Sequence, residues 1–230
     1  MRPNVSQVHK ELKVFRRLKK KYSNYITSDS EISYDIGSLD GTDSISLSQI
    51  FDTKILAFEP SPNSFKIVAK NLEIVNGSAF EFMLADYCGS SEFFVNDPLK
   101  TRTTWADGNQ GANSAFKSNI NYPIETYFQN SIKVQVRAIK CLIENGFPNP
   151  NFIWMDCQGS ELAVLKGMGS YLNEVSFIYC ELSLFQLYEN QPYAIEVIEY
   201  LSLFGFLWVG NLTFGSFQFD ACFVKPKKIS

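Results

Sequence analysis

Short apolar runs alternate with stretches of helical periodicity along most of the chain, and this alternation limits the folds that are open to it. The apolar runs, which we predict to be strands, occupy residues 32–36, 54–58, 80–84, 152–155 and 175–180. The helical stretches occupy residues 43–50, 61–75, 160–172 and 193–204. Strands that alternate with helices form a largely parallel sheet with helices on both faces. We therefore predict an α/β fold with a doubly wound, Rossmann-like sheet.

Two further parts of the chain complete this pattern. Runs 206–209 and 221–224 are separated by a Gly-containing loop, which predicts a closing antiparallel pair. Residues 92–95 indicate a short extra strand and 134–139 alternate again, but the intervening segment 97–130 is polar and without a sustained period. A connection of this length is uncommon inside a compact domain. We interpret 97–130 as either a lid over a bound acceptor or an ordinary surface loop.

The first 30 residues differ in charge from the rest of the chain. Eight of the 21 Lys/Arg residues, but only one of the 24 Asp/Glu residues, fall within positions 1–21. Apolar residues recur there at helical spacing, at Val8, Leu12, Phe15, Leu18 and Tyr22. We expect residues 1–30 to be a basic helical appendage on one domain, 31–230, with the apolar side of the helix covering that domain. A surface for nucleic acid or an anionic membrane is possible but not favoured, because the apolar stripe is modest.

Residue usage favours a cytoplasmic protein. No apolar run approaches the roughly 18 residues that span a bilayer, and no apolar core follows the N-terminal charges as it would in a secretory signal. The five cysteines are scattered and have no metal-type pairing, which favours a reducing compartment. None of these features indicates an oligomeric state.

Acidic residues stand at the carboxyl ends of five successive predicted strands: Asp35, Glu59, Asp86, Asp156 and Glu181. Sheets of this class bind ligands beyond the carboxyl ends of their strands. A single acid at such a position is often an ordinary surface group. Five in register predict a binding site.

The first motif, D-x-G-x-x-x-G, contains Asp35, Gly37, Ser38 and Gly41 and lies between a strand and a helix. The glycines allow the backbone to approach a ligand closely, and the amides at the helix start can meet a polar group. The leading acid would repel a pyrophosphate and suits a ligand with a cationic amino-acid end. The spacing differs from the dinucleotide fingerprint, although an ordinary tight turn would also explain it.

Two further acids extend this prediction towards a nucleoside. Glu59, followed by Pro60, ends the next strand about 20 residues later, where a carboxylate can accept both ribose hydroxyls. Asp86, with Tyr87 beside it, ends the third strand and is positioned to accept from an adenine amino group. Each could instead be a surface acid.

The third motif is D-C-Q-G-S-E-L-A-V-L-K-G at 156–167. Together with D-I-G-S-L-D-G-T-D-S at 35–44 and F-E-P-S-P at 58–62, it resembles the FkbM family of S-adenosylmethionine-dependent methyltransferases. The resemblance extends over roughly 31–225, and segments 197–206 and 219–224 are similar to the family's carboxyl-terminal end. One departure is Cys157-Gln158 where Val-Glu is common, which puts any role that needs a carboxylate at position 158 in doubt.

The resemblance implies a class I methyltransferase fold, with seven strands of which the last is antiparallel. It implies that the turn from Asp35 to Gly41 meets the methionine end of S-adenosylmethionine, that Glu59 meets the ribose and that Asp86 meets the base. It also implies an O-methyltransferase whose acceptor is a hydroxyl of a sugar or another small metabolite.

Methyl transfer from a sulfonium mainly requires alignment and the exclusion of water. An aliphatic hydroxyl also needs a base. The candidates are Asp156, Glu161 and Glu181, with Asp156 preferred. Asp156 and Glu161 could instead cap a helix and orient the substrate. The acids could also hold a divalent cation, but there is no third clear ligand and we expect no metal.

The candidate acceptor-binding residues lie in 97–130 and in the third motif: Arg102, Trp105, Asn113, Ser114 and Gln158. Aromatic and amide side chains suit a polyhydroxylated acceptor. Three alternatives stay open. The chain could be an N-methyltransferase or RNA modifier that uses its basic helix, or a non-catalytic S-adenosylmethionine-binding module. The third, a nicotinamide-dependent oxidoreductase, is disfavoured by the D-x-G-x-x-x-G spacing.

Overall fold

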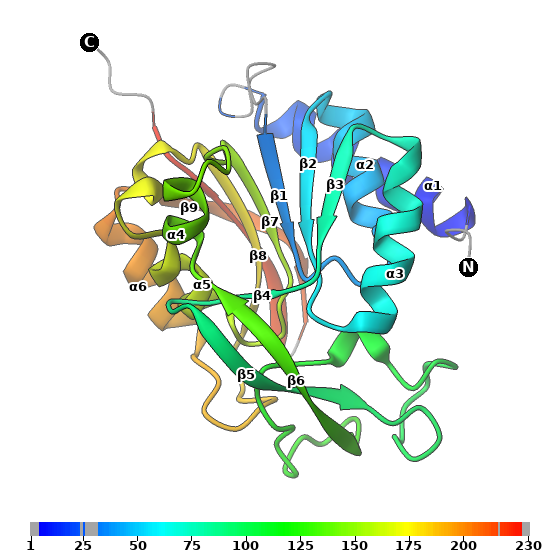
Figure 1. Ribbon diagram of the computed structural model, residues 1–230. Helices are drawn as coiled ribbons and strands as arrows, with labels where there is room; N and C mark the ends of the chain where they lie inside the picture. The colour runs from blue at the N-terminus through cyan, green and yellow to red at the C-terminus, as the bar shows by residue number, and fades with distance from the viewer. Residues whose placement is uncertain (1–4, 24, 26–31, 216, 227–230) are drawn as a thin grey trace.

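The computed structural model describes residues 5–23, 25, 32–215 and 217–226, and its centre is a seven-stranded sheet (Figure 1). The strand order is β3-β2-β1-β7-β8-β10-β9. The strands are β1 (Ile32–Ile36), β2 (Lys54–Phe58), β3 (Gly77–Phe80), β7 (Phe152–Met155), β8 (Phe177–Ser183), β9 (Leu207–Phe214) and β10 (Gln218–Val224). From β3 to β8 neighbouring strands are parallel, whereas β10 is antiparallel to both of its neighbours. This arrangement confirms the predicted fold class and its antiparallel last strand.

Helices cover both faces of this sheet. On one face lie α1 (Val5–Lys21), α2 (Thr42–Phe51) and α3 (Pro62–Asn71); on the other lie α4 (Ile139–Glu144), α5 (Glu161–Met168) and α6 (Ala194–Leu203) (Figure 1). Short 3₁₀ turns follow at η1 (Leu72–Ile74), η2 (Gln110–Ala112) and η3 (Gly169–Glu174). Pro62 occupies the first turn of α3, where its fixed φ and missing N–H do no harm.

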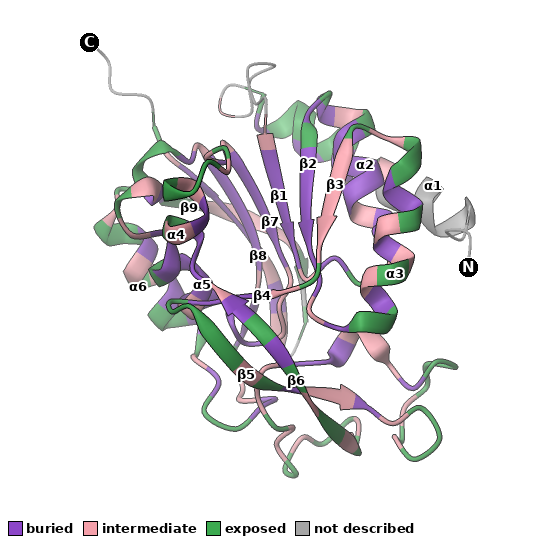
Figure 2. Ribbon diagram, viewed as in Figure 1, coloured by how far each residue is buried: buried purple, intermediate pink, exposed green. Residues whose placement is uncertain are grey.

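Strands β1, β2, β7, β8 and β10 are mostly buried because each face of the sheet packs against a helical layer (Figure 2). Successive side chains of a strand point to opposite faces. In β7, Phe152 and Trp154 therefore pack with α1 and α2, while Ile153 and Met155 pack with α5 and α6. This explains why the central strands are continuous apolar runs rather than alternating ones.

The basic helix α1 is part of the core. Phe15 and Leu18 are fully buried, and the Phe15 ring lies 4.6 Å from that of Trp154. Lys13, Arg16 and Lys20 are exposed on the opposite side. The apolar side of the helix therefore covers the domain as predicted, at Phe15 and Leu18; residues 1–4, 24 and 26–30 of the predicted appendage lie outside the described residues.

A second sheet of order β4-β6-β5 lies at the carboxyl ends of the main strands (Figure 1). It contains β4 (Met83–Leu84), β5 (Gly89–Asn96) and β6 (Gln129–Arg137). The predicted strand 80–84 is therefore wrong as a single element. β3 ends at Phe80, exposed Glu81 interrupts the run, and Met83 pairs with Val136 in the second sheet. The six-residue helix α4, too short to show a period, was not predicted.

Within the described ranges, none of the helices has both the length and the apolar character needed to cross a bilayer.

Candidate functional site

The turn after β1 lies directly against the end of β7. Gly37 has φ +84°, and its N–H donates to the Phe58 carbonyl at 3.0 Å. A Cβ at Gly37 would stand 1.9 Å from the backbone oxygen of Asp156, so no larger residue fits. Gly41, with φ +79°, precedes the first residue of α2. These positive φ angles explain why the turn uses glycine at both positions.

Glu59 connects this turn to the start of α3. Its side chain is buried, and its two carboxylate oxygens accept the backbone N–H of Leu39 at 2.9 Å and of Ser61 at 2.8 Å. Burial raises the pKa of Glu59 to about 7, and the two backbone hydrogen bonds oppose that rise. The carboxylate is therefore held in a fixed orientation at the carboxyl end of β2.

The first cavity lies between the ends of β1 and β2 and the second sheet. Its lining includes Glu59, Pro60, Phe82, Met83, Phe93 and Asn113. Asn113 is buried and accepts the Asn96 N–H at 2.8 Å through Oδ1, but its Nδ2 has no hydrogen-bond partner. Because buried amides are normally satisfied, this unused donor in an otherwise largely apolar cavity indicates a ligand with an acceptor atom.

The second cavity lies on the α1 side of the sheet and is acidic. Its lining includes Asp35, Asp40, Asp43, Asp156 and Asp220. Asp35 is buried, accepts a hydrogen bond from Ser44 Oγ, and has its pKa raised to about 6 by burial. Ser38 is also buried and donates to the Asp35 carbonyl at 2.9 Å. The first and second cavities share Gly37, Leu39 and Asp156, so they meet at the turn after β1.

Gln158 bridges two of the predicted carboxylates. Its Nε2 donates to Asp156 Oδ1 at 2.6 Å and to Glu181 Oε2 at 3.1 Å. The Tyr188 hydroxyl, 2.8 Å from Gln158 Oε1, fixes which end of the amide faces the acids. Burial raises the pKa of Asp156 to about 7, and burial followed by the charge of Asp156 raises that of Glu181. The amide at position 158 therefore donates hydrogen bonds to both acids, whereas a carboxylate at the same position would repel both.

Glu161 lines neither the first nor the second cavity, nor a third cavity that lies over the end of β8. It is buried, and its Oε1 accepts the N–H groups of Cys157 at 3.1 Å and Gly159 at 3.3 Å. The carboxylate is therefore occupied by the loop that follows β7. This placement agrees with the capping alternative and not with the predicted catalytic role.

The third cavity lies over the end of β8. It is lined by Trp105, Glu125, Tyr127, Gln158, Glu181 and Gln218, among others. Gln158 lines both this cavity and the first, so the two adjoin at the bridged carboxylates. Gln218 Nε2 donates to Glu181 Oε2 at 2.6 Å.

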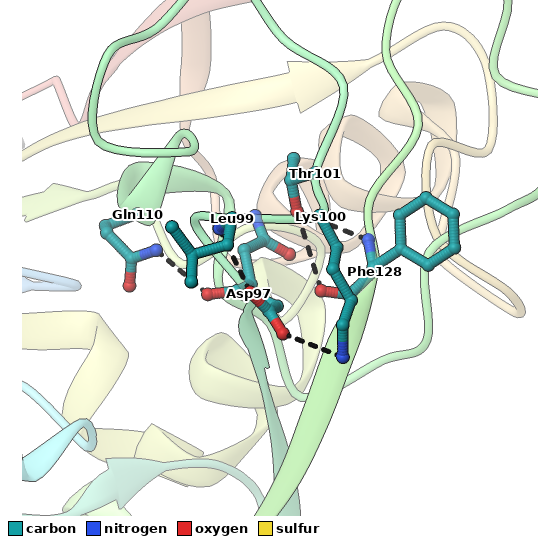
Figure 3. Close-up of polar contacts among 7 residues, drawn as sticks. Asp97, Leu99, Lys100, Thr101, Gln110 and Phe128 are labelled. Atoms are coloured by element: carbon teal, nitrogen blue, oxygen red, sulfur yellow. Dashed lines mark hydrogen bonds and ion pairs between the residues drawn. The ribbon is translucent and has the colours of Figure 1, made fainter.

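Segment 97–130 is tied down by its own polar contacts (Figure 3). Asp97 accepts the Leu99 N–H at 3.0 Å and forms an ion pair with Lys100 at 3.2 Å. Thr101 Oγ1 accepts the Phe128 N–H at 3.3 Å, which joins the two ends of the segment. Residues of this segment also form part of the lining of the first cavity and of the third.

The other predicted acceptor residues have different placements. Ser114 is buried and donates to the Gln158 carbonyl at 2.7 Å, so it supports the loop. Arg102 is exposed, pairs with Thr126 in a short bridge, and lines none of the three cavities. Trp105 lines the third cavity although 61% of its surface is exposed.

The predicted adenine contacts at Asp86 and Tyr87 are not supported. Both residues are exposed, and neither lines a cavity. The reason is the early end of β3, since the chain enters the second sheet before it reaches Asp86. Met83 and Leu84 line the first cavity in their place.

Sequence reasoning missed two residues of the carboxylate network, Tyr188 and Gln218. Gln218 begins β10, which is longer than the predicted run 221–224 and brings it beside Glu181. Tyr188 lies in an irregular loop, and no sequence pattern indicated that it belongs to the site. Among the described residues, no group of three or more His, Cys, Asp or Glu side chains could hold a metal ion.

The sequence matches the model of the methyltransferase FkbM domain family over residues 35–207. The 2-O-methyltransferase NoeI of Sinorhizobium fredii is 26% identical over 196 residues, which are 84% of this chain and 78% of that protein. The hexuronic acid methyltransferase AglP of Haloferax volcanii is 27% identical over 159 residues, 67% of this chain and 56% of that protein.

Among solved structures, magnesium protoporphyrin IX methyltransferase from Synechocystis aligns with a TM-score of 0.49 and 9% identity, over 98% of this chain and 87% of that one. Precorrin-6y C5,15-methyltransferase from Geobacter metallireducens aligns with a TM-score of 0.48 and 13% identity, over 91% of this chain and 87% of that one.

Proposed function

The chain belongs to the FkbM family of S-adenosylmethionine-dependent methyltransferases, and from this membership we propose that it methylates a hydroxyl group of a sugar or similar polyhydroxylated small molecule. Two relatives named as a 2-O-methyltransferase and a hexuronic acid methyltransferase support a sugar acceptor. The observation that carries the proposal is the carboxylate pair bridged by Gln158, at the junction of the first and third cavities.

The residues of the first and second cavities fit the cofactor. The apolar lining of the first cavity suits a base, and the fixed carboxylate of Glu59 suits ribose hydroxyls. Asn113 Nδ2 is an unused donor in the same cavity. The aspartates of the second cavity, including Asp35, suit a cationic amino-acid end. The turn at Gly37 separates the two cavities, so one elongated ligand would lie across it.

The third cavity suits the acceptor. Its Trp105 and Tyr127 offer aromatic surfaces, and its Gln218 offers an amide that can hydrogen-bond to hydroxyl groups. The adjoining position of this cavity brings an acceptor hydroxyl towards the carboxylate pair.

The bound cofactor supplies a methyl group on a positively charged sulfur. Asp156 accepts the proton of the acceptor hydroxyl as that oxygen is methylated, and Glu181 shares the hydrogen-bond donor that fixes Asp156. A carboxyl group whose pKa is about 7 holds and releases a proton near neutral pH. Gln158 holds Asp156 through Oδ1 and Glu181 through Oε2, so the second oxygen of each carboxylate is not used by Gln158.

A transfer assay with labelled S-adenosylmethionine over saccharides, nucleic acids and amine metabolites tests the proposal. We expect label on a saccharide, and an Asp156→Asn variant about 100-fold slower or more. Only ionised Asp156 can act as a base, so the wild-type rate should rise with pH through about 7. Calorimetry with S-adenosylhomocysteine verifies that the variant still folds and binds. Label on RNA or an amine alone would contradict the proposal, and an Asp156→Asn variant of normal rate would contradict the base.

A further inference from the structure

Arg17 of α1 lines the second cavity, whose lining also contains five aspartates. Its side chain is exposed, and Val14, nearly one turn earlier in the same helix, lines the cavity with it. In the part of the chain that the structure describes, Arg17 forms no ion pair, although the same cavity contains so many carboxylates. A cation that faces acids without contacting them leaves space for a ligand between the two.

Thr42, at the first turn of α2, points to a ligand independently. The residue is only 5% exposed and lines the second cavity, yet its Oγ1 is buried and has no hydrogen-bond partner among the described residues. An unsatisfied buried hydroxyl is uncommon, because its desolvation is not compensated. A polar ligand group in the cavity would satisfy it.

The charges of this cavity match an α-amino acid. An ammonium group and a sulfonium are attracted by the aspartates, whereas a carboxylate would be repelled by them and needs a cation. Arg17 is the one Lys or Arg among the described residues of the lining. A guanidinium is also the side chain best suited to a carboxylate, because it can donate two parallel hydrogen bonds.

We propose that Arg17 binds the carboxylate of the cofactor's amino-acid end in the second cavity, and that Thr42 Oγ1 hydrogen-bonds to the same end. The inference rests on the proposed function, since it requires an adenosyl amino acid as ligand. It gives α1 a role in cofactor binding, although the helix lies outside the segment 35–207 that matches the family model. The helix is then part of the site as well as of the core.

Calorimetry with two ligands tests this without any acceptor. S-Adenosylhomocysteine has the amino-acid end, whereas 5′-methylthioadenosine has the same nucleoside and sulfur without it. We expect Arg17→Gln to weaken S-adenosylhomocysteine about tenfold or more and to leave methylthioadenosine binding unchanged. Arg17→Lys should recover part of the loss, because a point charge replaces a bidentate donor. Arg16→Gln, one position away, removes an equally exposed guanidinium that lines none of the three cavities, and should affect neither ligand.

The other outcomes are equally informative. Equal weakening of both ligands, or of neither, by Arg17→Gln would overturn the assignment of Arg17. Thr42→Val removes the unsatisfied hydroxyl without a large change in shape. It should weaken the binding of S-adenosylhomocysteine severalfold and leave the binding of methylthioadenosine unchanged. Unchanged binding of both ligands would overturn the assignment of Thr42. If the wild-type protein binds neither ligand, the proposed function itself fails, whatever Arg17 does.

Discussion

At Gly37 two backbone segments meet so closely that the identity of one residue controls the site. We predict that Gly37→Ala lowers the free energy of unfolding by about 2 kcal/mol or more, from the strained φ and from contact with the Asp156 oxygen. Gly41→Ala is the matched control, because its φ is similar but its Cβ would lie 3.5 Å from the nearest atom. It should cost about 1 kcal/mol. Denaturant titration measures both, and equal losses would show that the φ angle alone matters.

The residues that sequence reasoning located best are those whose positions follow from the sheet. Gly37 and Glu59 come together because parallel neighbours β1 and β2 end at the same edge. The direction of each side chain was harder to predict. Glu161 faces its own loop because Gln158 adopts φ 50°, a left-handed conformation that no local pattern indicated. The bridging role of Gln158 likewise depends on residues distant in sequence.

The least predictable elements were those without a local period. Segment 97–130 is ordered by pairings between distant residues, such as Ser118 with Tyr188, and not by a repeating apolar pattern. Run 80–84 is apolar and was predicted as one strand. An exposed residue interrupts it, however, and its two parts belong to two different sheets. By contrast, α2, α3, α5 and α6 were located from their periods and end signals to within a few residues, apart from the 3₁₀ turns that continue α3 and α5.

Helix α1 gives a prediction at the scale of an element. Its buried Phe15 contacts the rings of Phe51 and Trp154, so Phe15→Ala leaves a cavity between the helix and the sheet. We expect a loss of about 3–5 kcal/mol in the free energy of unfolding. Lys20→Ala, on the exposed side, should change it by less than about 0.5 kcal/mol. If thermal and denaturant unfolding of the Phe15 variant match the wild type, the packing of α1 against the sheet does not stabilise the domain.

At the scale of the whole molecule, acids collect at the carboxyl ends of the strands, whereas α1 is strongly basic. The third cavity follows this distribution, since its lining contains Glu125 and Glu181, and no Lys, Arg or His among the described residues. A negatively charged acceptor would be repelled there without a compensating cation. The relative AglP is named for a hexuronic acid. From the acidic lining we expect this chain to prefer an uncharged sugar.

Three acceptors that differ only at one carbon distinguish the effect of the acceptor's charge on the methylation rate from the effect of its size. We predict that a methyl glucuronoside is methylated at least about tenfold less efficiently, in kcat/KM, than the corresponding methyl glucoside, because a loss of about 1.4 kcal/mol in transition-state binding corresponds to that factor. The methyl ester of the glucuronoside is bulkier than the acid but neutral, so it should recover most of the rate if the acidic lining is responsible. An ester as poor as the acid would indicate a steric limit, and an acid that outperforms the glucoside would mean that a cation reaches this cavity from elsewhere in the protein.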